Sequence, residues 1–511
     1  MSMRYENRRQ FLRTASAGSV AAIASGLAFT SGLPRVSAED AELKPELVQF
    51  DDHIEPLVRL IEESPRDRLL EQVAGRIRGG RSYREVLAAL LLAGIRNVQP
   101  YPAVGFKFHC VLVVNACDLA SIAGPAEERW LPIFWALDYF KSSQADEART
   151  SGWHMSGVNE SLVPDATQAR TMFVEAMDNW DVEKADAATA GLVRTAGATE
   201  VFNLIARYAA RDYRSIGHKA IYLANSWRTL QVIGWQFAEP VLRSLTFALL
   251  NHDGEPNPAQ SDLEVDRPWR ENSEKIARIS ENWMSGKLDD AVPTELFQAF
   301  RGESSSIAAD TAVDALSRGV SPQSVWDGVF VGAGELLMRQ PGIIGLHGLT
   351  TANAMRYLWQ HAADDKLRRQ LILQACSFNP MFRDSAKGRG TIADHTVEDL
   401  QPSVPEAAGS EALNEILSDI SGNQMRAAKK LRSFLASGGS GYDFVDATRS
   451  LLFMKGRDAH DYKFSSAVLE DYGHVSQAWR DRFLAMSVFN LKGSGDPDNG
   501  LVKRTRSALQ G

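Results

Sequence analysis

Residues 105–116, G-F-K-F-H-C-V-L-V-V-N-A, are the stretch that decides the fold. They read as an apolar helix into which a single histidine, His109, is set. Two later stretches share the pattern: residues 217–226, G-H-K-A-I-Y-L-A-N-S, and residues 345–354, G-L-H-G-L-T-T-A-N-A. In each, a glycine precedes the histidine, and Asn-Ala or Asn-Ser follows six or seven residues later. The repeated pattern predicts several apolar helices that place their histidines in similar surroundings.

Four histidines belong to this group: His109, His218, His347 and His460, spaced 109, 129 and 113 residues apart. His460 lies in D-A-H-D-Y-K and lacks the asparagine. A polar, titratable side chain in an apolar helix is costly unless it has a partner. A metal ion shared by all four is one partner that explains them together. The alternative is that each histidine is satisfied separately by a carbonyl or a carboxylate.

Helical periodicity extends through the chain, whereas strand alternation is rare. It predicts helices at residues 82–97, 130–141, 169–178, 200–208, 238–250, 324–338, 366–377 and 411–435. We therefore expect an all-α fold, a large multi-helix bundle or helical-hairpin array with a buried central site. Breaks fall at residues 251–261 and 383–409, and the second predicts a long surface loop. Residues 39–511 are expected to form a single domain.

The N-terminus has the order of a targeting segment. Residues 7–13, N-R-R-Q-F-L-R, match a twin-arginine export signal, an uncharged stretch follows over residues 14–34, and V-S-A at residues 36–38 is a small-x-small cleavage site. Residues 1–38 are therefore predicted to be a signal peptide, recognised by the twin-arginine export machinery. The mature protein would work in the periplasm or elsewhere in the bacterial cell envelope. Because this route carries folded proteins, it favours a cofactor inserted before export.

The charge balance limits the kinds of molecule that the mature protein is expected to bind. Loss of residues 1–38 removes five basic residues and one acidic residue, which leaves 51 basic against 63 acidic side chains and a formal net charge of −12. Such an acidic surface argues against nucleic acid and anionic lipid as partners. No stretch after the signal is expected to be long and apolar enough to span a bilayer, because the best, residues 86–98, is short and contains Arg96.

The histidine set predicts a metal centre. Neutral imidazole binds iron, copper, zinc, nickel or manganese, and helix bundles build such sites from facing helices. His154 and His474 are alternative ligands. The three asparagines, Asn115, Asn225 and Asn353, have different registers. A +7 offset places Asn225 on the face of His218, whereas +6 offsets turn Asn115 and Asn353 toward neighbouring helices.

Three lysines near these histidines are unexpected in apolar surroundings: Lys107, Lys219 and Lys463. Burial favours the neutral amine, which can react with carbon dioxide to form a carbamate that supplies oxygen ligands. Lys463 follows His460 by three residues, so both can face one point, whereas Lys219 diverges from His218 by about 100°. Further candidates are Glu239 and Glu335 as acid–base groups or histidine orienters, and Asp461 as the orienter of His460. The three cysteines are read as buried thiols.

The dispersed histidines in apolar helices with adjacent lysines resemble the questin oxidase-like family, helical enzymes that oxidatively open fused aromatic rings. The resemblance is one of pattern across about residues 80–475. It implies a non-haem iron oxygenase with His109, His218, His347 and His460 as ligands to Fe²⁺, and Lys219 or Lys463 as a carboxylated ligand. It also implies an aromatic or apolar organic substrate.

Two other functions remain open. The same ligands could hold zinc in a metallohydrolase or lyase, with bound water as the nucleophile. Alternatively, the chain is a non-enzymatic helical scaffold of the envelope whose histidines are structural. Neither a G-x-S-x-G elbow nor an H-E-x-x-H helix occurs, which disfavours serine hydrolases and zincins.

Overall fold

The computed structural model describes residues 47–100, 104–250, 256–257, 262–403 and 407–510. These residues form 22 α-helices and no β-strand, so the predicted all-α multi-helix fold is confirmed. The predicted signal peptide, residues 1–38, lies outside the described residues. The helices are α3 (Glu55–Glu63), α4 (Arg66–Arg78), α5 (Tyr83–Asn97), α6 (His109–Ala123), α7 (Trp130–Thr150), α8 (Ala169–Asn179), α9 (Val182–Thr195), α10 (Ala198–Ala209), α11 (His218–Ile233), α12 (Ala238–Leu250), α13 (Arg267–Lys275), α14 (Ala291–Gly302), α15 (Ser305–Ser317), α16 (Pro322–Arg339), α17 (Ile343–His361), α18 (Asp365–Lys387), α19 (Gly409–Gly422), α20 (Gln424–Ala436), α21 (Gly441–Lys455), α22 (Ala459–Asp471), α23 (Gln477–Ser487) and α24 (Leu501–Gln510).

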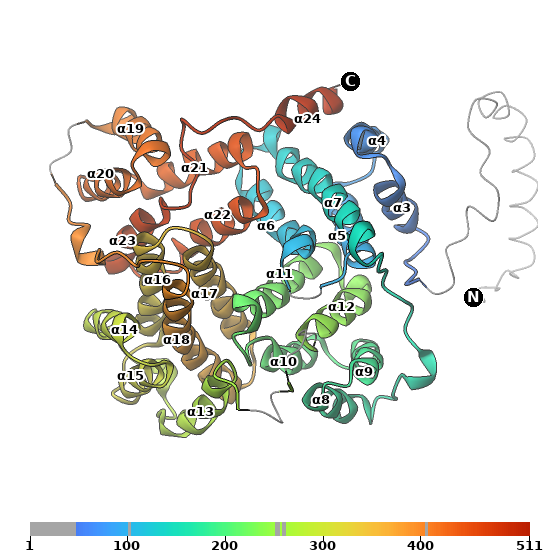
Figure 1. Ribbon diagram of the computed structural model, residues 1–511, viewed down its shortest axis with the longest axis horizontal. Helices are drawn as coiled ribbons and strands as arrows, with labels where there is room; N and C mark the ends of the chain where they lie inside the picture. Colours follow the sequence, from blue (N-terminus) through green and yellow to red (C-terminus); the bar gives the residue numbers. More distant parts are fainter. Residues whose placement is uncertain (1–46, 101–103, 251–255, 258–261, 404–406, 511) are drawn as a thin grey trace, which may run out of the picture. The chain divides into compact units, whose positions relative to one another are not determined.

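Four helices form a closed central ring within the unit of residues 48–511. α6 packs on α11, α11 on α17, α17 on α22, and α22 back on α6. Figure 1 shows these four around the middle of that unit, with the other helices outside them. We call α6, α11, α17 and α22 the ring helices. Each carries one of the four histidines, so the ring brings distant parts of the sequence to one place.

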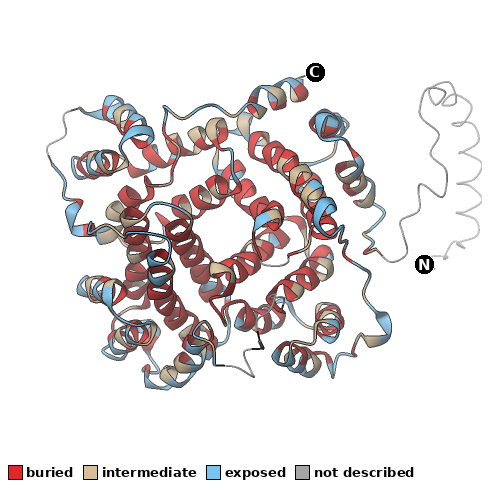
Figure 2. Cartoon of the chain, viewed as in Figure 1, coloured by how far each residue is buried: buried red, intermediate tan, exposed pale blue. Residues whose placement is uncertain are grey.

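The ring helices are core helices by composition. Every residue of α17 from Ile344 to Trp359 is buried, and α6 and α11 are buried on nearly every side. A helix that is apolar all round must be surrounded by other helices. Figure 2 shows this directly, because the ring helices are almost entirely buried and the outer helices expose one face each.

Each ring helix has its chain neighbours beside it. The preceding helices α5, α10, α16 and α21 and the following helices α7, α12, α18 and α23 pack against α6, α11, α17 and α22 respectively. The ring is therefore built from four similar segments, each an inner helix between two outer ones. This arrangement accounts for the near-even spacing of the histidines.

Polar side chains tie the ring helices together. The amide of Asn225 on α11 donates to the carbonyl of Leu112 on α6 (2.8 Å), and Ser466 on α22 donates to the carbonyl of Ala116 on α6 (2.7 Å). Since buried polar groups need partners, these bonds also fix the helix register. The asparagine after each histidine motif thus has a structural role in at least this case.

Asn353 on α17 is the most connected of these groups. Its amide donates to Glu470 (2.8 Å) and Asp471 (2.9 Å) on α22, and its oxygen accepts from Arg228 on α11 (3.1 Å). Arg228 also pairs with Glu470 at 2.8 Å. One side chain therefore joins three ring helices, as the expectation of a neighbouring-helix contact for Asn353 anticipated.

The segment between α18 and α19 contains little regular structure. α18 continues to Lys387, so the first residues of the loop expected over 383–409 are helical instead. Beyond it, a 3-10 turn at Val397–Asp399 is pinned by the backbone N–H of Val397, which donates to Glu335 (2.8 Å).

One stretch of the described residues, Phe106–Ala123, is long and apolar enough to cross a membrane by length and composition alone. The expectation that no stretch after the signal would meet these criteria is therefore wrong. Of this stretch 72% is buried inside the protein, as befits a ring helix.

Replacing Asn353 with alanine tests the polar tie between ring helices. The change leaves the buried Asp471 and Arg228 each one hydrogen bond short, so we expect the free energy of unfolding to fall by about 2–4 kcal/mol. Urea denaturation measures it. Asn179→Ala is the control, because Asn179 is exposed and bonds only within its own helix. Equal stability of the two variants would contradict the role of Asn353.

Candidate metal centre

All four histidines lie at the N-terminal ends of ring helices. His109 and His218 are the first residues of α6 and α11, His460 is the second residue of α22, and His347 is the fifth residue of α17. Because the four N-terminal ends meet, the structure brings the predicted set together.

The ring nitrogens of His109 and His347 lie close to those of both His218 and His460. Nε2 of His218 lies 3.0 Å from Nε2 of His109 and 3.1 Å from Nε2 of His347. The ligand nitrogens of His109, His347 and His460 all lie within 4.8 Å of one another. His109 and His347 are buried, and the His460 side chain is 20% exposed.

The hydrogen bonds of the Nδ1 atoms, the ring nitrogens that point away from the other histidines, show where two of these rings carry their hydrogen. Nδ1 of His218 donates to the carbonyl of Ser215, and Nδ1 of His347 donates to the carbonyl of Ile343, both at 2.6 Å. A carbonyl oxygen can only accept, so both Nδ1 atoms hold a hydrogen. In a neutral ring Nε2 then carries a lone pair. The Nε2 atoms of His218 and His347 therefore face each other as two acceptors.

Burial keeps these rings neutral. It is the largest cause that lowers the pKa of His109, His218 and His347 well below the ordinary histidine value, and the nearby Lys463 lowers each further. Neutral acceptors 3.1 Å apart repel, although the Lys463 amine and a hydrogen on Nε2 of His109 are each placed to donate to Nε2 of His218. A cation between them turns the repulsion into ligation, so the donor set fits a divalent transition metal.

The backbone before His218 is strained. Ser215, Ile216 and Gly217 have positive φ angles of 55°, 45° and 82°. Non-glycine residues in this conformation are strained, and such strain concentrates at functional sites. Here the turn directs the Ser215 carbonyl at His218. Only glycine fits at position 217, because a Cβ there would collide with the Thr351 side chain.

His460 is oriented by a carboxylate. Its Nδ1 lies 2.6 Å from Oδ1 of Asp458, and its Nε2 is buried without a hydrogen-bond partner. A carboxylate on the outer nitrogen orients a ligating histidine and raises its basicity. We expected Asp461 in this role, but Asp461 instead accepts from the backbone N–H of Arg457 and pairs with Lys492. The N-cap position of Asp458, two residues before His460, was the signal that could have identified it.

Lys463 belongs to the centre. Its Nζ lies 3.3 Å from Nε2 of His218, and the side chain is buried. Burial lowers the pKa of the Lys463 ammonium to about 7, although Asp458 opposes the shift. An amine with such a pKa is substantially neutral at physiological pH.

The other candidate residues lie elsewhere. Nζ of Lys219 is 2.9 Å from Oδ2 of Asp212, because consecutive helix residues point about 100° apart and Lys219 faces away from the histidines. Lys107 pairs with Glu147 at 2.9 Å.

The two acid–base candidates are also outside the centre. Glu239 accepts from Arg194, and Glu335 accepts from Arg301 and from the loop before α19. Both carboxylates therefore form ion pairs with arginines. The alternative ligands are likewise engaged elsewhere: His154 is exposed and His474 pairs with Asp471 at 3.1 Å.

The three cysteines are free and buried, as expected. Asn115 is buried with an unpartnered side-chain oxygen, and Asn225, predicted on the His218 face, donates to α6 instead.

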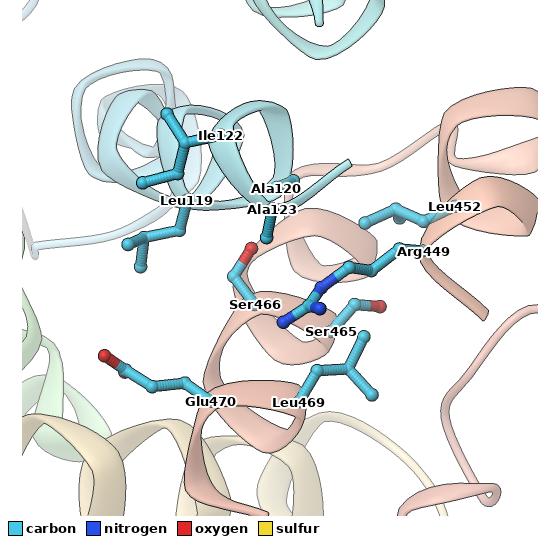
Figure 3. A pocket seen from close by; sticks show the side chains of 10 residues that line it. All are labelled: Leu119, Ala120, Ile122, Ala123, Arg449, Leu452, Ser465, Ser466, Leu469 and Glu470. Carbon is cyan, nitrogen blue, oxygen red and sulfur yellow. The ribbon is translucent and has the colours of Figure 1, made fainter. Parts of the chain in front are cut away.

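A pocket of about 140 Å³ opens at the far end of α6 and α22 (Figure 3). It lies between α6, α21 and α22, with the Arg449 side chain extending across it. Leu119 and Ala123 line it, ten and fourteen residues after His109 and so about 15–21 Å along the helix. It is therefore separate from the metal centre.

Comparison with known proteins finds no match, whether to a family model, to a curated protein or to a solved structure.

Lys463→Met tests whether a buried amine is held at a cost to stability. The pKa of Lys463 is lower in the folded protein than in the unfolded chain, so the folded state binds its proton less tightly. The penalty is full below pH 7 and disappears as the pH rises toward 10.5, the ordinary lysine value. We expect metal-free Lys463→Met to gain about 2–4 kcal/mol at pH 7 and little at pH 10.

Lys107→Met is the matched control with the opposite sign. It removes the one cation paired with the buried Glu147, which keeps its hydrogen bonds from Ser151 and from the backbone of Gln99 and Trp153, so we expect a loss of about 1–3 kcal/mol. Denaturant unfolding at both pH values measures the two variants. A Lys463→Met protein less stable than wild type at pH 7 would contradict the assignment.

Proposed function

We propose that this chain is a metal-dependent oxidoreductase, a non-haem iron oxygenase that acts on an aromatic or otherwise apolar organic substrate. The observation that carries the proposal is the gathering of histidine nitrogens in a buried site, where the Nε2 lone pairs of His218 and His347 face each other at 3.1 Å. A hydrogen bond between these two rings does not explain the contact, because the outer nitrogens of both already hold the hydrogens.

The number of donors supports iron over zinc. Four histidines and a lysine exceed the four ligands of a structural zinc site. Such a set would suit an ion that takes more than four ligands, as Fe²⁺ does.

Lys463 supplies the proposed anionic ligand. Its neutral amine adds to carbon dioxide, forming an N–C bond and releasing one proton, and the resulting carbamate carries one negative charge. Four helix N-terminal ends, each positive, point at this site and favour an anion. The carbamate and Asp458 together would balance the two charges of a divalent ion. Lys219 is excluded from the role by its pairing with Asp212.

The residues of the site would have three separate roles: to bind the ion, to orient the ligand rings and to exclude water. His109, His218, His347 and His460 would hold the ion, which when bound supplies one-electron chemistry and an open position for dioxygen. The carbonyls of Ser215 and Ile343 and the carboxylate of Asp458 hold three of the rings in the ligating orientation. The buried, apolar ring helices exclude bulk water from the reacting groups.

The proposed substrate class comes from the resemblance to the questin oxidase-like family, which we propose as the chain's relatives. The proposed location follows from the predicted signal peptide, residues 1–38: we propose export by the twin-arginine machinery to the periplasm or cell envelope. Since that machinery carries folded proteins, the metal would be inserted in the cytoplasm.

Metal analysis of protein purified after export tests the proposal. We expect about one iron per chain, together with oxygen uptake on addition of a fused-ring aromatic substrate. His218→Ala and His347→Ala should each lose the iron. Asp458→Asn should weaken iron binding about 10–100-fold, the effect expected for a group that orients a ligand.

His361→Ala is the control, because Nδ1 of His361 donates to the Tyr357 carbonyl four residues back just as His347 donates to Ile343, yet it lies outside the centre. It should keep its iron. Stoichiometric zinc in the same site would favour the metallohydrolase or lyase alternative, and no bound metal would leave only the scaffold.

A further inference from the structure

A chain of aromatic rings leads outward from α22. The rings of Tyr462 on α22 and Trp135 on α7 have centroids 4.4 Å apart, and the rings of Trp135 and Tyr139 are stacked at 5.0 Å with an interplanar angle of 13°. Three readily oxidised side chains are thus in direct contact.

The inner end of this chain lies on the helix that carries His460 and Lys463. Tyr462 is two residues after His460, and their Cα atoms are about 5.5 Å apart on a helix. Because two residues turn the helix by about 200°, the Tyr462 ring lies on the opposite face of α22 from His460, toward α7. An electron therefore has to cross only the width of α22 between the Tyr462 ring and the candidate metal centre. Tyr462 is fully buried, and its hydroxyl has no hydrogen-bond partner.

The outer end reaches the surface. Trp135 and Tyr139 line an open pocket of about 490 Å³, together with Arg66, Asp138 and Arg457 among others. Trp135 is 4% exposed and Tyr139 is half-buried. A small molecule in this pocket would contact the chain without entering the buried centre.

The polar surroundings decide which ring can hold a radical. A tyrosine gives up an electron easily only when its proton has an acceptor, and the Tyr462 hydroxyl has none. An indole needs no such acceptor, because its cation radical persists with the proton in place. Trp135 is therefore the first place where an electron vacancy can rest, and Tyr139, beside the pocket, is the second.

We propose that Tyr462, Trp135 and Tyr139 form an electron-transfer route that protects the metal centre from oxidative damage when no substrate is bound. The inference rests on the proposed function. When dioxygen or a peroxide over-oxidises the centre, one electron passes from Trp135 past Tyr462 to the centre. Each passage delivers one electron and leaves Trp135 as a cation radical, so two passages supply the two electrons that a peroxide takes up.

Tyr139 then reduces Trp135 and releases its proton to solvent in the pocket. A hydrogen-atom donor of the phenol or enediol class, bound in the pocket, restores Tyr139 by giving up one electron and one proton. The oxidant is consumed and the histidines keep their rings. The route accounts for a surface pocket that contacts the aromatic chain but not the centre.

Freeze-quench electron paramagnetic resonance tests the route in iron-loaded protein mixed with hydrogen peroxide in the absence of substrate. We expect a tyrosyl radical in the wild type, a tryptophan radical in Tyr139→Phe, and neither in Trp135→Phe. Peptide mass spectrometry should find at least about threefold more oxidised histidine at His109 and His460 in Trp135→Phe per peroxide added.

Trp130→Phe is the matched control, because Trp130 lies on the same helix but contacts Tyr83 and Phe134 instead of Tyr462. It should behave as the wild type does. Iron-loaded wild type without a radical, or Trp135→Phe with unchanged histidine oxidation, would overturn the route and leave the proposed function intact. Protein that binds no iron would overturn both.

Discussion

The structure depends on one constraint: the neutral rings of His218 and His347 face each other with their Nε2 lone pairs 3.1 Å apart in a buried site. Left to themselves, two acceptors at that distance repel. The protein nevertheless holds them there, with the Nδ1 hydrogens of His218 and His347 committed to backbone carbonyls. Such an arrangement costs free energy, which a bound metal ion would recover.

The rest of the fold serves this meeting point. Four buried helices present their N-terminal ends to one another, and Asn225, Asn353 and Ser466 hold them in register with hydrogen bonds between helices. A strained turn before His218 directs the carbonyl of Ser215 toward Nδ1 of His218. The outer helices cover the ring helices and bury the four histidine-bearing ends.

Much of this could be predicted from the sequence. Apolar helical periodicity predicted the all-α fold. The glycine–histidine–asparagine pattern, which three of the four histidines share, indicated that these distant histidines lie close together. The glycines in that pattern meet different structural requirements: Gly217 adopts a left-handed conformation, whereas Gly345 allows α17 to approach Leu337 on α16.

Other features could not be predicted, because they depend on tertiary partners. Helix geometry placed Lys463 better than Lys219, but the choice between them stayed open, because it depends on Asp212 beside the first and His218 beside the second. Glu239 and Glu335 lie in apolar helices, yet arginines from distant helices neutralise them. Asp458 was overlooked in favour of Asp461, since the N-cap geometry that aims a carboxylate at His460 appears only once the helix start is known.

The most direct test of the central claim is a crystal structure of the natively exported protein with anomalous data collected on both sides of the iron absorption edge. We expect one anomalous peak among Nε2 of His109, His218, His347 and His460, strong above the edge and weak below it. We also expect electron density for a carbamate beyond Nζ of Lys463. Four histidines at the observed separations with no anomalous peak between them would contradict the claim.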